Sequence, residues 1–319
     1  MVELATRTAL GGVTAQPHGN QYTSVVVYDL TGRPDPVGWV YAYRPALHDD
    51  LAERGAVLLR GLPAGLDAFQ RLVHLIGGDT LAYTERSTPR SVVSGNIYTS
   101  TDYPADQAIP LHNENSYSDT WPDRLFFWCD TPAATGGATP VADSRAVFRL
   151  VPADVRARCA DGVGYARTFR DGLGLSWQEA FQTEERATVE GYCAAHGIGY
   201  TWDGGTLRTR HHRPASQREP VTGQEVWFNQ AHLFHVSSLE PEVREALSLL
   251  GEDELPRNAY LADGRPIPDA DIAEVSLAYQ RASVAIPWRR GDLLVINNML
   301  MAHGRQPYAG DRRILVAMT

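Results

Sequence analysis

The stretch from Leu111 to Asn115 places a histidine and a carboxylate two positions apart. Side chains at positions i and i+2 of a β-strand point to the same face. One strand could therefore bring the imidazole of His112 and the carboxylate of Glu114 to the same point. Two histidines and one carboxylate are the ligand set of non-haem Fe(II) oxygenases, which leaves metal positions open for a co-substrate and for O2. The rest of the chain would have to supply a second histidine and a group that holds the co-substrate.

The C-terminal part of the chain offers both of these groups. His303 follows the apolar stretch 293–296, which is expected to be a strand, and the pair Arg312–Arg313 lies shortly beyond it. A dicarboxylate such as 2-oxoglutarate would chelate the metal with one end and would need a buried cation at the other. Arginine suits that role because its planar guanidinium binds a carboxylate in a bidentate way. Thr139 could add a hydroxyl beside it.

Taken together and in this order, three motifs resemble the TauD/TfdA family of Fe(II)/2-oxoglutarate-dependent dioxygenases. They are His112–Asn113–Glu114, Gly136–Gly137–Ala138–Thr139, and His303 with Arg312–Arg313. Four further segments resemble the SyrP-like hydroxylases of antibiotic biosynthesis: residues 55–61, 87–90, 98–101 and 227–230. The resemblance covers most of the chain. It implies an all-β core with inserted helices (α+β), a double-stranded β-helix or cupin-like jelly roll, as a single domain over residues 1–319.

The resemblance also implies a site. His112, Glu114 and His303 would bind Fe(II), and Arg313 with Thr139 would bind 2-oxoglutarate, with O2 as the other co-substrate. Only one of Arg312 and Arg313 can face the pocket, because adjacent strand residues face opposite ways; we predict Arg313. The carboxylate ligand is a glutamate, as in clavaminate synthase. Glu114 argues against a halogenase, because those enzymes carry a small residue at this position to admit chloride.

The substrate is expected to be an amino acid or an amino-acid derivative of secondary metabolism, free or tethered to a carrier protein. Hydroxylation is the expected outcome, although desaturation, epoxidation and cyclisation use the same oxidant. The candidate substrate-binding residues are Asn96, Thr99, Asn115, Tyr117, Asn229, Gln230 and Arg305. A metal-dependent sensor without activity is the alternative from another class. An intact co-substrate site at Arg313 and Thr139 counts against it.

Composition narrows the class of protein. The chain has 319 residues, of which 43% are hydrophobic and 21% are charged, as in globular proteins. A net charge of −9 argues against nucleic-acid binding. No apolar run is long enough to span a membrane, and the first residues do not resemble a secretory signal. Three widely spaced cysteines are typical of free thiols in a cytoplasmic protein.

Hydrophobic periodicity predicts elements around these motifs. Strands are expected at 24–28, 55–61, 226–228, 293–296 and 314–317, and helices at 47–53, 66–76, 176–191 and 241–250. The polar stretch 206–220, which includes His211, is predicted to be a solvated loop. Its arginines could alternatively form a lid or a docking patch for an acidic carrier protein. For His232 and His235, a pocket role and a core role remain open.

Overall fold

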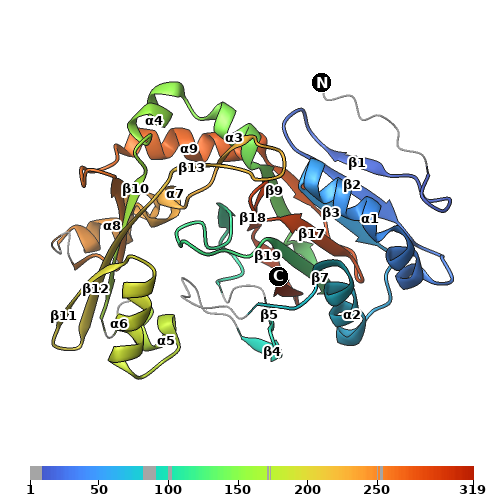
Figure 1. Cartoon of the computed structure of the whole chain (residues 1–319), viewed down its shortest axis with the longest axis horizontal. Helices are drawn as coiled ribbons and strands as arrows, with labels where there is room; N and C mark the ends of the chain where they lie inside the picture. Colours follow the sequence, from blue (N-terminus) through green and yellow to red (C-terminus); the bar gives the residue numbers. More distant parts are fainter. Residues whose placement is uncertain are drawn as a thin grey trace.

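The computed structural model describes residues 9–81, 91–99, 103–170, 172, 174–249, 251 and 254–319. The motif segment 87–90 and the second half of the segment 98–101 lie outside these ranges. Figure 1 shows the arrangement of the described elements, with the N-terminal strands and helices (blue) on one side of the molecule and an inserted sheet (green and yellow) on the other.

The largest sheet has eight strands in the order β1-β2-β3-β17-β7-β20-β5-β4. Their bounds are β1 (Gln16–Gly19), β2 (Ser24–Asp29), β3 (Ala56–Arg60), β17 (Leu293–Asn297), β7 (Arg124–Thr131), β20 (Arg313–Met318), β5 (Ile97–Thr99) and β4 (Val92–Ser94). All neighbours pair antiparallel except β2 and β3. A parallel pair needs a crossover connection, and here that connection carries helix α1 (Pro36–Arg54).

A second sheet of four strands faces the first. Its order is β16 (Val284–Ile286), β9 (Thr139–Asp143), β18 (Met301–Arg305) and β6 (Ile109–His112). Buried side chains from both sheets form one apolar core, to which Val141 and Met301 contribute from the second sheet and Phe127 and Val316 from the first. The expected fold class, an all-β core with inserted helices in a jelly-roll arrangement, is confirmed.

Helices α1 and α2 (Leu66–Gly77) cover the outer face of the eight-stranded sheet (Figure 1). The prediction for α2 is confirmed almost to the residue. The short helix expected at 47–53 is the last part of the longer α1. That helix begins after Asp35, whose carboxylate accepts a hydrogen bond from the Gly38 N–H, and it tolerates Pro45 inside it.

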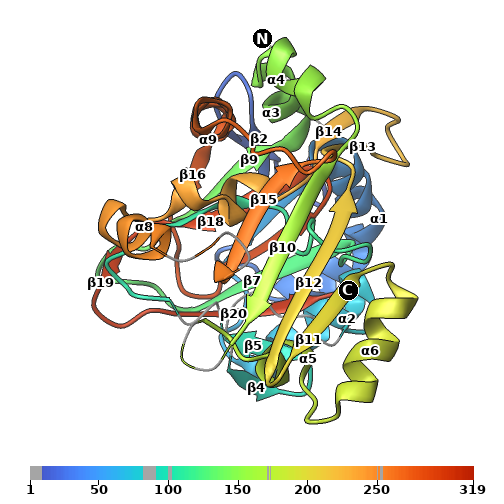
Figure 2. The same cartoon turned by 90° about the vertical axis from the view of Figure 1, so that its left-hand side faces the viewer.

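A third sheet is built from the segment between α4 (Ala153–Arg158) and α9 (Asp269–Ala282), and Figure 2 shows it face on. Its order is β11 (Gly199–Asp203), β12 (Thr206–Arg213), β10 (Val163–Phe169) and β15 (Arg257–Leu261). The prediction of a solvated loop at 206–220 is wrong, because β12 buries every second side chain: Leu207, Thr209 and His211. The alternation was hidden by the polarity of two of these three residues.

The remaining elements connect and cover the sheets. They are β8 (Thr135–Gly136), β13 (Ser216–Arg218), β14 (Glu225–Trp227), β19 (Tyr308–Ala309), α3 (Ser144–Leu150), α4 (Ala153–Arg158), α5 (Trp177–Phe181), α6 (Arg186–Ala195), α7 (Ala231–Phe234), η1 (Val236–Ser238), α8 (Pro241–Ser248) and α9 (Asp269–Ala282). The helix expected at 176–191 is divided into α5 and α6, because Gln182 adopts the left-handed conformation that ends α5. None of the helices within the described ranges is long and apolar enough to cross a membrane.

Candidate metal centre

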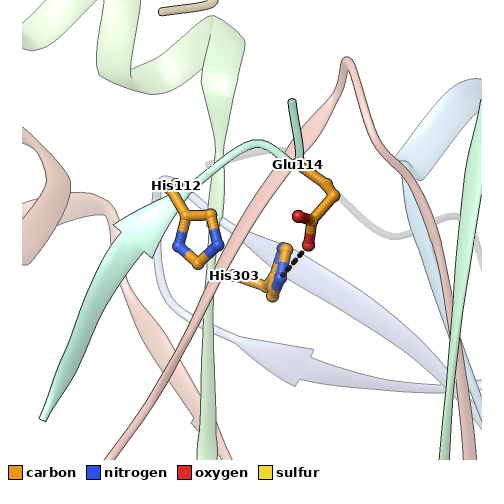
Figure 3. A group of neighbouring side chains, drawn as sticks. All are labelled: His112, Glu114 and His303. Atoms are coloured by element: carbon orange, nitrogen blue, oxygen red, sulfur yellow. Dashed lines mark ion pairs between the residues drawn. The ribbon is translucent and has the colours of Figure 1, made fainter. Parts of the chain in front are cut away.

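Two histidines from different strands of the second sheet face each other. His112 is the last residue of β6, and the antiparallel pairing of β6 with β18 sets it directly opposite His303. Their ring centroids are 4.5 Å apart, and Phe127 of β7 packs 5.0 Å from the His303 ring. The strand pairing itself therefore determines how the two imidazoles approach (Figure 3).

Glu114 completes the group from a turn. Strand β6 ends at His112, so the expectation that both residues share one strand is wrong. The chain instead turns after His112, and the carboxylate folds back toward the histidines, with Glu114 Oε2 3.8 Å from His303 Nε2 (Figure 3). One potential ligand atom from each of His112, Glu114 and His303 lies within 4.8 Å of the other two. The three predicted ligands are thus brought together in a geometry that one metal ion could bridge.

The turn that carries Glu114 is held by two buried asparagines. The Asn298 side chain accepts a hydrogen bond from the Glu114 N–H (2.8 Å) and donates to the Glu114 carbonyl (2.9 Å) and to the Pro122 carbonyl (3.0 Å). The Asn113 amide donates to the Asn298 carbonyl (2.6 Å) and to the Ser144 hydroxyl (3.0 Å). Both asparagines are 0% exposed. Nothing in the sequence pointed to this role of Asn298, although the residue directly follows the apolar strand before His303.

His112 has a defined tautomer in this arrangement. Its Nδ1 lies 2.9 Å from the Pro110 carbonyl oxygen, which can only accept a hydrogen bond. Nδ1 therefore carries the proton, and Nε2 is left with the lone pair that a metal ion requires.

Two further histidines support the neighbouring backbone. His232 Nε2 lies 2.8 Å from the Leu111 carbonyl in β6, and His211 Nε2 lies 2.7 Å from the Tyr117 carbonyl. Burial lowers the pKa of both rings to about 4, so both are neutral near pH 7. His235 forms a short turn with Ser237. These contacts give His232 and His235 structural roles, and His211 is a buried strand residue rather than part of a solvated loop.

A cavity opens beside the histidine pair. Its described lining consists of Ile109, His112, Phe127, Thr139, His303, Gly304, Arg305, Arg312, Ile314 and Val316. Phe127 of β7 and Ile314 and Val316 of β20 give the cavity an apolar wall, and Arg305 and Arg312 give it cationic groups. This lining would suit a small molecule that has both a metal-chelating end and an anionic end.

Of the adjacent pair Arg312 and Arg313, it is Arg312 that lines this cavity. Its Nε donates to the Gly137 carbonyl (3.0 Å), and its guanidinium lies over the Tyr308 ring at 5.4 Å. Burial, together with the charge of the nearby Arg305, lowers the pKa of Arg312 to about 10. The prediction that Arg313 faces the pocket is wrong. Its side chain is 53% exposed and points to Asp130, with Arg313 Nη1 3.3 Å from the Asp130 carboxylate.

Thr139 lies where the sequence predicts a hydroxyl. It is the first residue of β9, is 2% exposed, and lines the cavity. The Trp288 indole N–H donates to the Thr139 hydroxyl oxygen (3.0 Å). Because the hydroxyl oxygen accepts this bond from the indole, the proton of the Thr139 hydroxyl points away from Trp288. Trp288 belongs to the site through this contact, and nothing in its sequence context pointed to that role.

Of the seven candidate substrate-binding residues, Arg305 alone is among the described residues that line the cavity. Its guanidinium donates to the carbonyls of Tyr103 (3.0 Å), Pro104 and Gln107 (2.8 Å). These three bonds anchor the segment before β6. Arg305 therefore shapes one wall of the cavity while most of its donors are already engaged.

The other six candidates are not part of the described lining of the cavity. Gln230 donates to the Asn113 carbonyl (2.7 Å), and Tyr117 packs in the apolar cluster of the third sheet. The remaining side chains contact nearby segments: Asn229 the Ala215 carbonyl and the Ala231 N–H, Asn96 the Thr80 carbonyl, Thr99 the backbone of Ser91, and Asn115 the Tyr117 hydroxyl at 3.5 Å. Gln230 supports the metal-site turn directly.

Comparisons with known proteins agree with the motifs and the fold. A model of the "Taurine catabolism dioxygenase TauD, TfdA family" matches residues 37–319. The dapdiamide synthesis protein DdaC of Enterobacter agglomerans is 40% identical over 282 residues, covering 87% of this chain and 85% of DdaC. A clavaminate synthase-like protein of Arabidopsis thaliana is 30% identical over 282 residues, covering 84% of this chain and 82% of the relative. The crystal structure of PvcB from Pseudomonas aeruginosa superimposes with a TM-score of 0.56 at 17% identity, covering 96% of this chain and 90% of PvcB, which shows a shared fold.

Proposed function

Because the chain belongs to the TauD/TfdA family of dioxygenases, we propose that it is an Fe(II)- and 2-oxoglutarate-dependent oxygenase that hydroxylates an amino acid or an amino-acid derivative. The observation that carries the proposal is the convergence of His112, Glu114 and His303 beside a cavity that Arg312 lines. Family membership makes the protein an enzyme of the dioxygenase class. The sensor alternative has no observation in its favour.

The donor set fits iron. Two neutral imidazoles and one carboxylate from one side of a site are typical of Fe(II) oxygenases, and the open side faces the cavity. Bound iron would supply the activation of O2 for C–H oxidation, with 2-oxoglutarate as the electron donor. The protein's own contribution is to orient the ligands. The Pro110 carbonyl sets the tautomer of His112, and Asn298 holds the backbone of Glu114 on both sides.

The co-substrate position follows from the two ends of the cavity. A chelating keto acid at the metal would leave the far carboxylate of 2-oxoglutarate pointing away from the metal ligands. Arg312 is the cation that faces this space, and Thr139 adds a hydroxyl oxygen held by Trp288. Phe127, Ile314 and Val316 form the apolar wall, which excludes water and strengthens the pairing of the guanidinium with a carboxylate.

The proposed substrate class rests on the relatives. DdaC, which is 40% identical to this chain, is a dapdiamide synthesis protein. This similarity supports a biosynthetic reaction on an amino-acid derivative, either free or bound to a carrier protein. Desaturation, epoxidation and cyclisation would use the same site and are distinguished by the product.

The experiment is a mass-shift screen. Purified protein with Fe(II), 2-oxoglutarate and air is incubated with amino acids and with aminoacyl thioesters of a carrier protein, and succinate is measured in the same reactions. A product 16 Da heavier, formed with succinate in equal amounts, identifies hydroxylation. The matched control is His303→Ala, which should lose both products. Equal succinate formation by this variant and the unaltered protein would show that the ligand assignment is wrong.

A further inference from the structure

Two buried side chains at the start of helix α7 contact the backbone beside the proposed metal ligands. The Gln230 amide donates a hydrogen bond to the Asn113 carbonyl (2.7 Å), and His232 Nε2 lies 2.8 Å from the Leu111 carbonyl. A carbonyl oxygen can only accept, so His232 Nε2 carries the proton and donates it. Both side chains are 4% exposed, so water cannot readily take their place.

The two carbonyls belong to the peptide units that directly precede two of the ligands. The Leu111 carbonyl is part of the peptide unit that leads into His112, and the Asn113 carbonyl is part of the one that leads into Glu114. The second of these units is held at both ends. Its oxygen accepts the hydrogen bond from the α7 side, and its N–H donates to the Asn298 side chain (2.8 Å).

The backbone around Glu114 needs such support, because no strand ladder continues through it. Strand β6 ends at His112, and Asn115 adopts a φ of +54°, in the left-handed region that residues other than glycine seldom occupy. A conformation of this kind persists only where its surroundings hold it. His303, in contrast, lies inside β18, which pairs with β9 on one side and β6 on the other. The third ligand is therefore held by strand pairing, whereas Glu114 depends on side-chain contacts.

Helix α7 is itself fixed to the third sheet. The Tyr165 hydroxyl of β10 accepts a hydrogen bond from the Gln230 N–H (2.9 Å), and the Tyr165 ring lies 5.0 Å from the Phe234 ring. The Asn229 side chain is 0% exposed and donates to the Ala215 carbonyl (2.7 Å). The third sheet, which is inserted between β9 and β16, thus reaches the metal centre through the first residues of α7.

We propose that Gln230 and His232 are positioning residues of the metal centre. By holding the peptide units that lead into His112 and Glu114, they direct both side chains toward one metal ion. The inference rests on the proposed function, because it requires the three proposed ligands to bind a metal. Loss of a residue that orients a metal ligand typically weakens metal binding roughly 10–100-fold. Here the contacts act through the backbone, so we expect the lower end of that range.

The test measures metal binding without turnover, by calorimetric titration with Mn(II) in the absence of oxygen. Gln230→Met and His232→Phe remove the donor and keep a side chain of similar size, and phenylalanine can retain the packing of the His232 ring 4.7 Å from Tyr279. Each variant should bind Mn(II) roughly tenfold more weakly. His232→Gln can place an amide donor near the position of Nε2, so its Mn(II) affinity should stay within about threefold of that of the unaltered protein.

His48→Phe is the matched control. His48 Nε2 also lies 2.9 Å from a main-chain carbonyl, that of Ile76, but this contact joins α1 to α2. Both histidine-to-phenylalanine changes should lower the free energy of unfolding, measured with urea on the metal-free proteins. Only His232→Phe should also weaken Mn(II) binding, whereas His48→Phe should leave it unchanged within about twofold. A purely structural role of His232 predicts the loss of stability alone.

Two results would overturn the proposal. One is unchanged Mn(II) affinity in Gln230→Met and His232→Phe, and the other is an equal loss of affinity in His48→Phe. If His232→Phe does not fold, Gln230→Met decides against the same control. Failure of the proposed function has a different signature, because the unaltered protein would then bind no Mn(II), which would overturn both proposals together.

Discussion

Replacing Asn298 by alanine should disturb the metal site without touching a ligand side chain. Three side-chain hydrogen bonds would be lost, two to the backbone of Glu114 and one to the Pro122 carbonyl. The residue is 0% exposed, so water cannot readily replace them. At about 1 kcal/mol for each hydrogen bond, the free energy of unfolding should fall by about 3 kcal/mol. The turn would also lose the contacts that orient Glu114, so the affinity for a divalent metal should fall roughly 10–100-fold, as for other residues that orient metal ligands.

Asn20→Ala is a matched control for this change. Asn20 also forms three side-chain hydrogen bonds, accepting from the N–H groups of Tyr22 and Thr23 and donating to the Ser283 carbonyl. Two of these bonds are exposed to solvent and the one from Thr23 is partly buried, so water can replace most of them, and we expect a loss below about 1 kcal/mol with no change in metal affinity. Urea unfolding of the metal-free variants measures the first quantity, and calorimetric titration with Mn(II) measures the second.

Comparison of the two variants isolates the effect of burial. If Asn298→Ala lowered stability no more than Asn20→Ala and bound Mn(II) as tightly as the unaltered protein, the argument that Asn298 positions Glu114 would be refuted. A loss of stability with intact metal affinity would leave Asn298 a structural residue only.

Three further predictions follow from the site. Arg312→Met should raise the KM for 2-oxoglutarate roughly 10–100-fold, as expected for loss of a charge-assisted pair. Arg313→Met should change this KM less than about twofold, because the Arg313 side chain forms an exposed ion pair. Equal KM values in the two variants would reject the assignment of Arg312. Mn(II) at 100 times its Kd should stabilise the unaltered protein by about 2.7 kcal/mol but not Glu114→Gln, as thermal unfolding will test. Burial lowers the pKa of His211 from 6.5 to about 4, so the contribution of the neutral ring to stability is complete above pH 6.5 and is lost as the pH falls toward 4. His211→Gln should therefore flatten the dependence of the free energy of unfolding on pH between pH 6.5 and 4. An unchanged pH dependence would contradict this prediction.

The histidine and carboxylate motif could be predicted from sequence because the chemistry requires particular side chains. The choice between Arg312 and Arg313 could not be, for a local reason. Strand β20 begins at Arg313, and its pairing with β7 shifts register between Arg313 and Ile314. Arg312 thus lies before the strand, where the alternation of strand faces does not apply. A β-bulge redirects side chains in this way and leaves little trace in composition.

Strand β12 shows a second limit. The buried positions of β12 include a threonine and a histidine, so its side chains alternate in burial but not in hydrophobicity. A prediction based on hydrophobic periodicity therefore assigns this segment to a loop. Asn298 and Trp288 were likewise beyond prediction, because their partners at Glu114 and Thr139 are far away in sequence. Contacts of this kind become visible only once the two sheets are folded against each other.

The pairing of β6 with β18 joins proposed ligands that are synthesised at different times. His112 and Glu114 are synthesised well before His303, which reaches its partner only when β18 enters the sheet. A nascent chain that has not yet reached β18 therefore carries an incomplete set of the proposed ligands. A slip of β18 by one residue would have the same effect, because it would turn His303 to the other face of the sheet. Tight metal binding would then report native strand register, which makes metal uptake a direct probe of the pairing of β6 with β18.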